Sequence, residues 1–559
     1  MKLIPSIGLP KGRAGSFIVD EVADGYEAFA LAAIASDIAP DRPLIFVARD
    51  GQRLPAVVEA LAFAAPDLPV LELPAWDCLP YDRVSPGSDA AARRLDALAS
   101  MAALAGKPHR AVLLTTANAL LQRVPPAASI EAQTFRAKPG NQIDMKVLIS
   151  RLETSGFERV PTVREVGEFA VRGGILDLFV PGAEDALRLD FFGDTLESIR
   201  AFDPASQRTT GQRNQLVLQA MSEVALTPDT ISRFRRAYIE TFGAPSRDDA
   251  LYAAVSEGRR FAGMEHWLPF FYERLETVFD YLPDAPVVFD HLAHEALAER
   301  RKLVLDHFEA RRNQGALKDA VPYKPVAPDL LYLSPEGVNE ATAGREAIEL
   351  TPFAAPEASD RKVFHAGSRA GRSFAEERAD PNANVFETAV KHIADERAKK
   401  RRVVVAGWTD GSLDRLGQIL AEHHLGRLKT VATLADVERL ETGQAALAVL
   451  PLETGFETDG LVVVAEQDIL GDRLVRRAKK RKRASDFIAE AASLSAGDIV
   501  VHADHGIGRF IGLRTIEAAG APHDCLEIHY AGDDRLFLPV ENIELLSRYG
   551  SDSAEATLD

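Results

Sequence analysis

Residues 25–125 alternate between helix-like and strand-like stretches, and this alternation constrains the fold more than any other feature of the chain. The helix-like stretches are GYEAFALAAIASDI, RLPAVVEALAFAAP and SDAAARRLDALASMAAL. Each is followed by a short apolar run, PLIFVA, LPVLELP and RAVLLTT in turn. This order is typical of a largely parallel sheet covered by helices. We therefore predict that a parallel α/β domain begins within residues 1–125.

The length of 559 residues requires several domains, because a single core stops growing near roughly 250 to 300 residues. Within 126–215, the segment GEFAVRGGILDLFVPGAEDALRLDFFGDTLESIRAFD has short strands separated by glycine turns. It predicts an inserted α+β domain built on an antiparallel meander. Helical sequence resumes at 216–345, which we assign to the second part of the parallel domain. We interpret 346–385 as a linker and 386–472 as a small α/β domain.

The last part of the chain begins with a basic segment. Seven of the eight residues from Arg476 to Arg483 are Lys or Arg, which predicts a solvated linker at 473–493, with a local phosphate or acidic contact as the alternative. Residues 494–552 contain about five short strands with tight turns, which predict a small SH3/Tudor-like β-barrel. In its hairpin, strand alternation places Leu526, Ile528 and Tyr530 on one face.

Charge and composition exclude several classes of protein. The formal net charge of -18 argues against a broadly basic surface, so any nucleic-acid contact is expected to be local. Cys78 and Cys525 are too few for a disulfide framework or a cysteine zinc site, and they fit reduced thiols in the cytoplasm. No apolar run approaches about 18 residues, so we expect no membrane contact. The expectation is a cytoplasmic monomer.

Two glycine-containing stretches raise the question of ligand binding. GLPKGRAGSF, from Gly8 to Phe17, lacks the lysine that follows the glycines in a phosphate loop, so we interpret it as structural, with ATP binding as the alternative. HADHGIGRFIG carries His502 and His505, but a zinc site needs about four ligands, and we expect no metal. No catalytic motif is recognisable, and we expect no catalytic residue.

The meander contains an outward-facing pair of side chains. In LRLDFFGD, strand alternation places Leu187, Leu189 and Phe191 on the buried face. Arg188, Asp190 and Phe192 then lie on the opposite face. An aromatic residue beside an arginine is typical of binding hot spots. The alternative is that a neighbouring loop covers Phe192.

Several long segments resemble one bacterial family in the same order along the chain. The segments at 73–98, LPAWDCLPYDRVSPGSDAAARRLDAL, at 167–179, GEFAVRGGILDLF, and at 188–209, RLDFFGDTLESIRAFDPASQRT, resemble the N-terminal region of transcription-repair coupling factors. That region is similar to the excision-repair protein UvrB. VVVAEQDILGDRLVRR resembles the end of the family's third domain. LSAGDIVVHADHGIGRFIGL and RLFLPVENIELLSRYG resemble its RNA-polymerase-interaction domain, which is related to CarD-type regulators.

The resemblance implies a role in transcription-coupled nucleotide excision repair. Full-length family members are ATP-dependent double-stranded DNA translocases that displace stalled RNA polymerase and recruit UvrA. UvrA binding is implied for Arg172, Arg188 and Phe192. Contact with the polymerase β subunit is implied for Arg514, Ile516 and Glu517, partly by strand addition, with Ile516 as the apolar anchor.

The resemblance also implies what this chain does not carry. The family's motor, which binds ATP and Mg²⁺ and most of the DNA, follows the polymerase-interaction domain, so we expect a recognition fragment with no cofactor of its own. Two rival hypotheses remain. One is a DNA-dependent ATPase that works through the first α/β domain, and the other is a CarD-type transcription regulator without a motor.

Overall fold

The computed structural model describes residues 3–104, 106–180, 183, 185–246, 249–314, 323–357, 361–471, 497–502, 506–518, 521–531, 534–539 and 546–548. The chain divides into two compact units, Met1–Gly471 and Asp472–Asp559, which are described one at a time. Neither the basic run at 476–483 nor His505 lies within the described residues. No helix in the described part of the chain combines the length and apolar composition that a membrane span needs.

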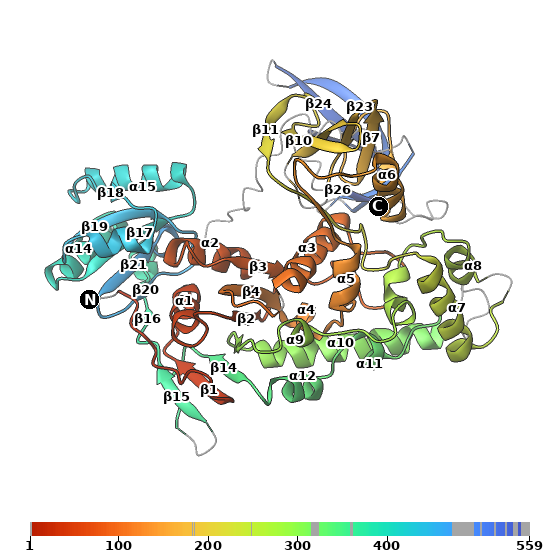
Figure 1. Cartoon of the computed structure of the whole chain (residues 1–559). Helices are drawn as coiled ribbons and strands as arrows, with labels where there is room; N and C mark the ends of the chain where they lie inside the picture. Colours follow the sequence, from red (N-terminus) through yellow and green to blue (C-terminus); the bar gives the residue numbers. More distant parts are fainter. Residues whose placement is uncertain are drawn as a thin grey trace. The chain divides into compact units, whose positions relative to one another are not determined.

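The N-terminal unit is built on a seven-stranded sheet in the order β15-β1-β14-β13-β2-β4-β3 (Figure 1). Every neighbouring pair is parallel, so the prediction of a parallel α/β domain is confirmed. The strands are β1 Gly15–Asp20, β2 Pro43–Ala48, β3 Val70–Leu73, β4 Ala111–Thr116, β13 Val287–Phe289, β14 Glu346–Leu350 and β15 Lys362–His365. The long helices that belong to this domain are α1 Glu27–Ile38, α2 Leu54–Ala64, α3 Ser88–Leu104 and α10 Ala293–Gln314.

The prediction of a linker at 346–385 is wrong. Strands β14 and β15 flank β1 in the first sheet, and β16 Arg369–Ala370 and α13 Ala375–Ala379 follow them. The sequence of β14, EAIEL, shows no strict alternation of charged and apolar residues, although Glu346, Ile348 and Leu350 are buried on one face. Such a short strand has a weak local signal, and it becomes a strand because β1 and β13 pair with it from distant parts of the sequence.

The inserted domain is a six-stranded sheet in the order β11-β10-β9-β8-β7-β6. All of its pairs are antiparallel except β6 with β7, so the predicted meander is confirmed. Helix α6 Met145–Thr154 packs Leu148 and Leu152 into the core of this sheet. The strands are β6 Glu158–Arg159, β7 Glu168–Arg172, β8 Ile175–Leu178, β9 Ala186–Phe192, β10 Thr195–Phe202 and β11 Thr209–Arg213. The chain enters this domain along β5 Phe135–Ala137 and leaves along β12 Leu216–Leu218, which pair with each other.

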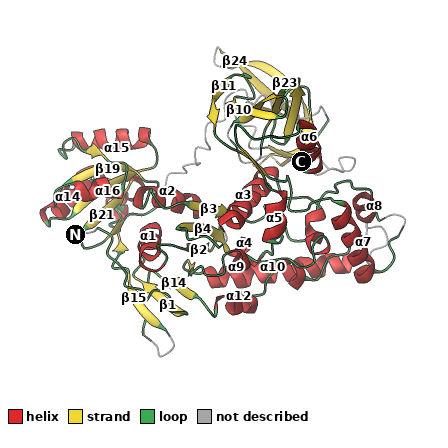
Figure 2. Ribbon diagram, viewed as in Figure 1, coloured by secondary structure: helices red, strands yellow, loops and turns green. Residues whose placement is uncertain are grey.

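A helical layer follows the meander in sequence (Figure 2). It contains α7 Pro228–Phe242, α8 Ala250–Ser256, the 3-10 helix η1 Met264–Phe270, α9 Val278–Tyr281, α11 Pro328–Leu331 and α12 Pro335–Thr342. Two further short helices, α4 Ala117–Leu121 and α5 Ala127–Gln133, precede the meander in sequence. Phe234, Trp267, Phe271 and Trp76 are buried together. The aromatic-rich segment near 264–272 is therefore core, as its composition indicated.

The small α/β domain is a second mixed sheet in the order β16-β20-β21-β17-β19-β18. It begins at β16 and shares one continuous core with α1 and α2 of the first domain. Phe456 packs against Tyr26 and Phe29, with ring centroids 5.0 and 4.9 Å apart. Its remaining elements are α14 Val385–Ala398, β17 Arg402–Gly407, α15 Asp410–Glu422, β18 Lys429–Thr430, α16 Leu434–Arg439, β19 Ala445–Val449, β20 Phe456–Glu457, β21 Leu461–Ala465 and α17 Glu466–Leu470.

The C-terminal unit is a five-stranded antiparallel sheet in the order β25-β24-β23-β22-β26. Its strands are β22 Ile499–His502, β23 Gly506–Ala518, β24 Ala521–His529, β25 Arg535–Pro539 and β26 Leu546–Arg548. Leu526 and Ile528 are buried with Val500, Phe510 and Leu538, and Tyr530 packs against them. The predicted small β domain and the alternation of its hairpin are confirmed.

Candidate protein-interaction sites

The outward face of the meander presents a row of charged side chains. Asp177 on β8 lies opposite Arg188 on β9, and Arg188 lies opposite Arg200 on β10. Leu187, Leu189 and Phe191 are buried on the other face, as the strand alternation predicted. Side chains that lie opposite one another on one face of a sheet are in direct reach, so Arg188 can pair with Asp177 across the two strands.

Asp177 accepts hydrogen bonds from two arginines of this face. Its side chain is 2% exposed, and the Arg188 guanidinium donates to both of its oxygens, Nε to Oδ1 at 2.7 Å and Nη2 to Oδ2 at 2.8 Å. Arg172 at the end of β7 also reaches Oδ2, at 3.4 Å, and its side chain is 52% exposed. The hydrogen bonds to Asp177 raise the pKa of Arg188. Asp177 therefore holds both arginines at the sheet surface.

The two arginines present different amounts of surface. The Arg188 side chain is only 17% exposed, and its guanidinium lies 4.6 Å from the centroid of the Phe202 ring. Arg188 is thus a partly covered residue that supports the face, while Arg172 is open to solvent. A paired, rigid guanidinium can still donate to a partner through hydrogen atoms that Asp177 does not use.

Phe192 closes β9 and is 77% exposed, the largest exposed fraction of any large apolar side chain in the described part of the chain. The alternative that a loop covers it is excluded. Gly193 follows with φ +61°, and Thr195 begins β10 opposite Phe192. A tight turn therefore holds an exposed phenyl ring at the edge of the Arg172–Asp177–Arg188 group, and we term these four residues the meander face.

Two carboxylates of the outward face, Asp190 and Asp177, were not assigned a role from the sequence. Asp190 accepts from Arg200 Nη2 at 2.7 Å and Nε at 2.9 Å, and also from the Ser198 hydroxyl. Asp177 itself was missed as well. The sequence signal was present, because Asp177 is a single carboxylate within the apolar strand ILDL, and a buried carboxylate needs a charged partner.

The predicted polymerase-binding residues lie on β23. Arg514 is 63% exposed, and its Nε pairs with Glu527 Oε2 at 2.5 Å. Glu527 also bonds to His529 Nε2 at 2.8 Å, and that hydrogen bond, with Arg514, lowers the pKa of Glu527. Ile516 and Glu517 have main-chain partners in His523 and Pro522 of β24. The side chains of Ile516 and Glu517 lie outside the described residues.

The second half of β23 has one open edge in the described strands. β22 pairs with β23 only from Gly506 to Arg509, whereas β24 pairs with it as far as Ala518. Phe510 still exchanges main-chain hydrogen bonds with Gly497 and Asp498, and no described strand lies beside the main chain of β23 on that edge beyond Phe510. This is the geometry that strand addition needs.

The glycine loop Gly8–Phe17 lies at the wrong edge of the sheet for a nucleotide. It precedes β1, whereas ligands of open α/β sheets bind beyond the carboxyl ends of the strands. Its amides are also occupied by carboxylates of the chain: Gly12 N donates to Glu346 at 2.9 Å, and Gly8 N donates to Asp37 at 3.1 Å. The geometry supports the structural interpretation of this loop.

The carboxyl edge of the sheet carries a buried charge cluster that the sequence did not reveal. Arg53 pairs with Glu27 and, through Nε at 3.1 Å, with Asp290; Asp24 is also within 3.5 Å. Gly25 N donates to Glu27 at 2.8 Å, just before α1. A carboxylate thus lies at the helix N-terminus, where a nucleotide-binding sheet would hold phosphate.

The charge cluster should make stability depend on pH. Burial raises the pKa of Glu27 from 4.5 to about 7, although Arg53 opposes the shift. The folded chain therefore retains a proton that the unfolded chain has released, and the free energy of unfolding should fall by about 2 kcal/mol as the pH rises from 4.5 to 7. Hydrogen exchange of α1 in urea measures this. Glu27→Gln should make the free energy of unfolding depend less on pH. Glu59→Gln is the control, because Glu59 is exposed, and it should leave the pH dependence unchanged. The same pH slope in both variants would contradict the role of Glu27.

One described group has the composition of a metal site, namely Asp20, Glu21 and His365. Two of its three side chains already bind other groups of the chain, because His365 Nδ1 bonds to Asp20 Oδ1 at 2.7 Å and Ala355 N donates to the other oxygen of Asp20 at 2.9 Å. Asp20 and His365 thus form a pair at the ends of β1 and β15, with Glu21 beside it. The side chain of His502 lies outside the described residues.

Comparison with known proteins places two segments in named domain families. Residues 135–223 match the UvrB interaction domain, and residues 494–550 match the CarD-like/TRCF RID domain. The first segment contains the meander face, and the second contains β23.

Whole-chain relatives are similar along most of this chain. The transcription-repair-coupling factor of Myxococcus xanthus is 34% identical over 544 residues, which cover 92% of this chain and 44% of that protein. Those of Escherichia coli (strain K12) and Rickettsia bellii are each 30% identical, over 537 and 493 residues, and cover 92% and 88% of this chain. The chain spans less than half the length of these relatives.

Proposed function

Because this chain corresponds to the N-terminal portion of transcription-repair-coupling factors, with their UvrB interaction domain and CarD-like RID domain, we propose that it is a recognition module of transcription-coupled nucleotide excision repair. It binds the β subunit of stalled RNA polymerase through the C-terminal unit and recruits UvrA through the meander face. ATP-driven movement along double-stranded DNA belongs to the complete factor.

The observation that carries UvrA binding is the exposed Phe192 beside the Arg172–Asp177–Arg188 group, inside the segment that matches the UvrB interaction domain. An exposed phenyl ring loses water on binding, and a guanidinium that is already held in place loses little side-chain entropy. Polymerase binding is supported by the open edge of β23, with Arg514 beside it.

The rival ATPase hypothesis receives no support from the first domain. At the sheet edge where a nucleotide would bind, the guanidinium of Arg53 already pairs with Glu27 and Asp290, and Asp24 lies within 3.5 Å. The chain's own acidic side chains therefore occupy the donors that a phosphate would need. The rival predicts DNA-stimulated ATP turnover by this chain, and our proposal predicts none.

Replacement of Phe192 by alanine should weaken UvrA binding at least tenfold while leaving stability within about 0.5 kcal/mol, because the ring is exposed. Titration calorimetry with purified UvrA measures the affinity, and urea unfolding measures the stability. Phe353→Ala is the matched control, since Phe353 is 67% exposed but lies beyond the end of β14. Equal UvrA affinity for the Phe192 and Phe353 variants would remove the meander face from the proposal.

A further inference from the structure

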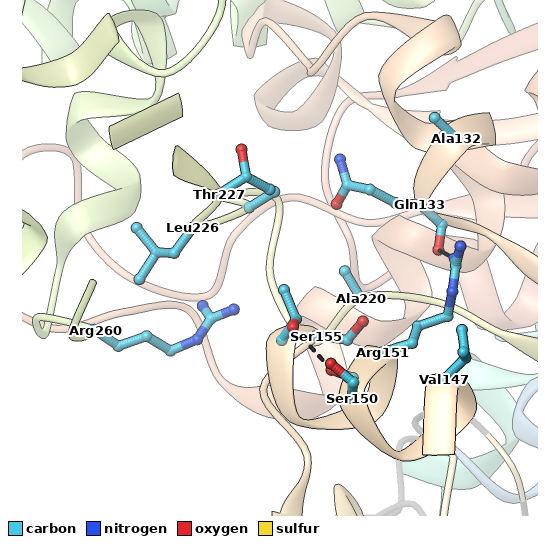
Figure 3. Close-up of a pocket in the computed structure, with 12 residues that line it drawn as sticks. Ala132, Gln133, Val147, Ser150, Arg151, Ser155, Ala220, Leu226, Thr227 and Arg260 are labelled. Atoms are coloured by element: carbon cyan, nitrogen blue, oxygen red, sulfur yellow. Dashed lines mark hydrogen bonds between the residues drawn. The ribbon is translucent and has the colours of Figure 1, made fainter. Parts of the chain in front are cut away.

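A cavity of about 410 Å³ lies where the inserted domain joins the rest of the N-terminal unit, and we term it the hinge pocket (Figure 3). Its walls come from the end of α5, the second half of α6, the exit segment at 220–227, and Arg260 after α8. Figure 3 shows Arg151 of α6 and Arg260 on opposite sides of the cavity, with Ser155 and Ala220 between them. Arg151 of the inserted domain and Arg260 of the helical layer therefore line the same cavity.

The charge of the hinge pocket is unusual for this chain. The chain carries a net charge of -18, yet no Asp or Glu is among the described residues that line the pocket. Two other pockets of the described chain are lined by carboxylates, Glu349 in one and Asp24 in the other. Two arginines without an acidic residue in the described lining attract an anion into the pocket.

The two guanidinium groups have unused donors. Arg151 donates one hydrogen bond, from Nη1 to the Gln133 carbonyl at 3.3 Å, and lies 5.5 Å from the centroid of the Phe135 ring. Arg260 forms no hydrogen bond or ion pair with any described residue, and its Nε lies close to the backbone of Gly156. Arg260 is an exposed residue. Desolvation of its guanidinium lowers the pKa of Arg260, and the charge of Glu265 opposes that shift.

The walls select among anions. Val147 is 64% exposed at the rim, and Leu226 with three alanines adds further apolar surface, so an aliphatic group fits beside the charge. No aromatic side chain is among the lining residues, so a nucleobase would find no ring to stack on. The C-terminal turn of α6 ends at Thr154, and the negative end of this helix disfavours a doubly charged phosphate more than a singly charged carboxylate. A single carboxylate on an aliphatic peptide satisfies all three conditions.

We propose that the hinge pocket binds a glutamate or aspartate side chain, flanked by an aliphatic residue, from a protein partner of this chain. The carboxylate accepts hydrogen bonds from Arg151 and Arg260, and the aliphatic neighbour covers Val147 and Leu226. Because Arg151 belongs to the inserted domain and Arg260 to the helical layer, the bound carboxylate also fixes the inserted domain against the helical layer. The proposal is independent of UvrA binding at the meander face, which lies on a different surface of the inserted domain.

The test uses a fluorescein-labelled pentapeptide of alternating leucine and glutamate, and its counterpart in which glutamine replaces glutamate. Fluorescence anisotropy with the whole chain should show saturable binding of the glutamate peptide and at least tenfold weaker binding of the glutamine peptide. Arg260→Gln and Arg151→Gln should each weaken the glutamate peptide at least tenfold. Arg259→Gln is the matched control, because Arg259 is the neighbouring residue, is exposed and pairs with Glu257.

Three results would overturn the proposal. The first is that the glutamate peptide shows no saturable binding up to 5 mM, roughly the weakest affinity of a useful contact. The second is that the Arg260→Gln chain binds the peptide as tightly as the unchanged chain. The third is that equimolar acetate or inorganic phosphate displaces the peptide. The last result would identify a small-anion site instead of a peptide site. Phe192→Ala should leave peptide binding unchanged, so failure of this proposal is distinguishable from failure of the UvrA proposal.

Discussion

Replacement of Arg94 by methionine is expected to lower the free energy of unfolding of the N-terminal unit by about 4 kcal/mol. Arg94 is fully buried, and its Nε lies 2.6 Å from Glu223 Oε1, which is also buried. Trp76 Nε1 donates to the same oxygen at 2.8 Å, and Arg94 Nη1 donates to the Pro74 carbonyl at 2.8 Å. Without the guanidinium, the buried Glu223 side chain loses its charged partner, and this is the source of the large effect.

Urea unfolding followed by circular dichroism checks this expectation. Arg93→Met is the matched control on the same helix, because Arg93 is 50% exposed and pairs with Asp89 at the surface, so it should change stability by less than about 1 kcal/mol. The double variant Arg94→Met with Glu223→Leu should recover most of the loss, since it removes both buried charges. If Arg94→Met is as stable as the unchanged chain, the ion pair contributes nothing.

The Arg94–Glu223 pair also bears on recognition. Glu223 lies just after β12, where the chain leaves the inserted domain, and Arg94 lies on α3 of the parallel domain. Gln219 on the same exit segment donates to Asp96 of α3 at 2.9 Å. Helix α3 therefore fixes the segment that leaves the inserted domain. Ala220 of this segment also lines the hinge pocket.

The elements that show a clear hydrophobic or glycine pattern in their own sequence were predicted correctly. The alternation of buried helices and strands predicted the parallel sheet, and the glycine turns predicted the meander. Strands β1, β14 and β15 were missed because they are short and partly polar, and each is stabilised by partners far away in sequence. The assignment of 346–385 as a linker failed for this reason.

The candidate sites were predictable to a similar extent. Period-two alternation placed Arg188 and Phe192 on the outward face, and this required only the strand geometry. That Arg188 would be largely covered was not predictable, because its cover comes from Asp177 on β8 and Phe202 on β10. The charge cluster around Arg53 was also missed, since it unites the first residue of α1, the residue before α2 and the residue after β13, which meet only at the edge of the sheet.

Arg188→Ala is expected to lower the free energy of unfolding of the inserted domain by about 3 kcal/mol, which separates its role from that of Phe192. The change removes two hydrogen bonds to Asp177, whose carboxylate is 2% exposed, and leaves only Arg172 at 3.4 Å. Hydrogen exchange of β9 in urea measures the effect.

Arg172→Ala serves as the control for Arg188→Ala, because Arg172 is 52% exposed and its loss should cost less than about 1 kcal/mol. UvrA affinity should therefore fall in both variants, but only Arg188→Ala should also lose stability. Replacing the acceptor Asp177 tests the same point. The double variant Arg188→Ala with Asp177→Asn should be more stable than Arg188→Ala alone, because asparagine keeps the shape of the side chain and leaves no buried charge. Equal stability of Arg188→Ala and Arg172→Ala would mean that Arg188 acts only as a contact residue, and that the meander face is held by its backbone alone.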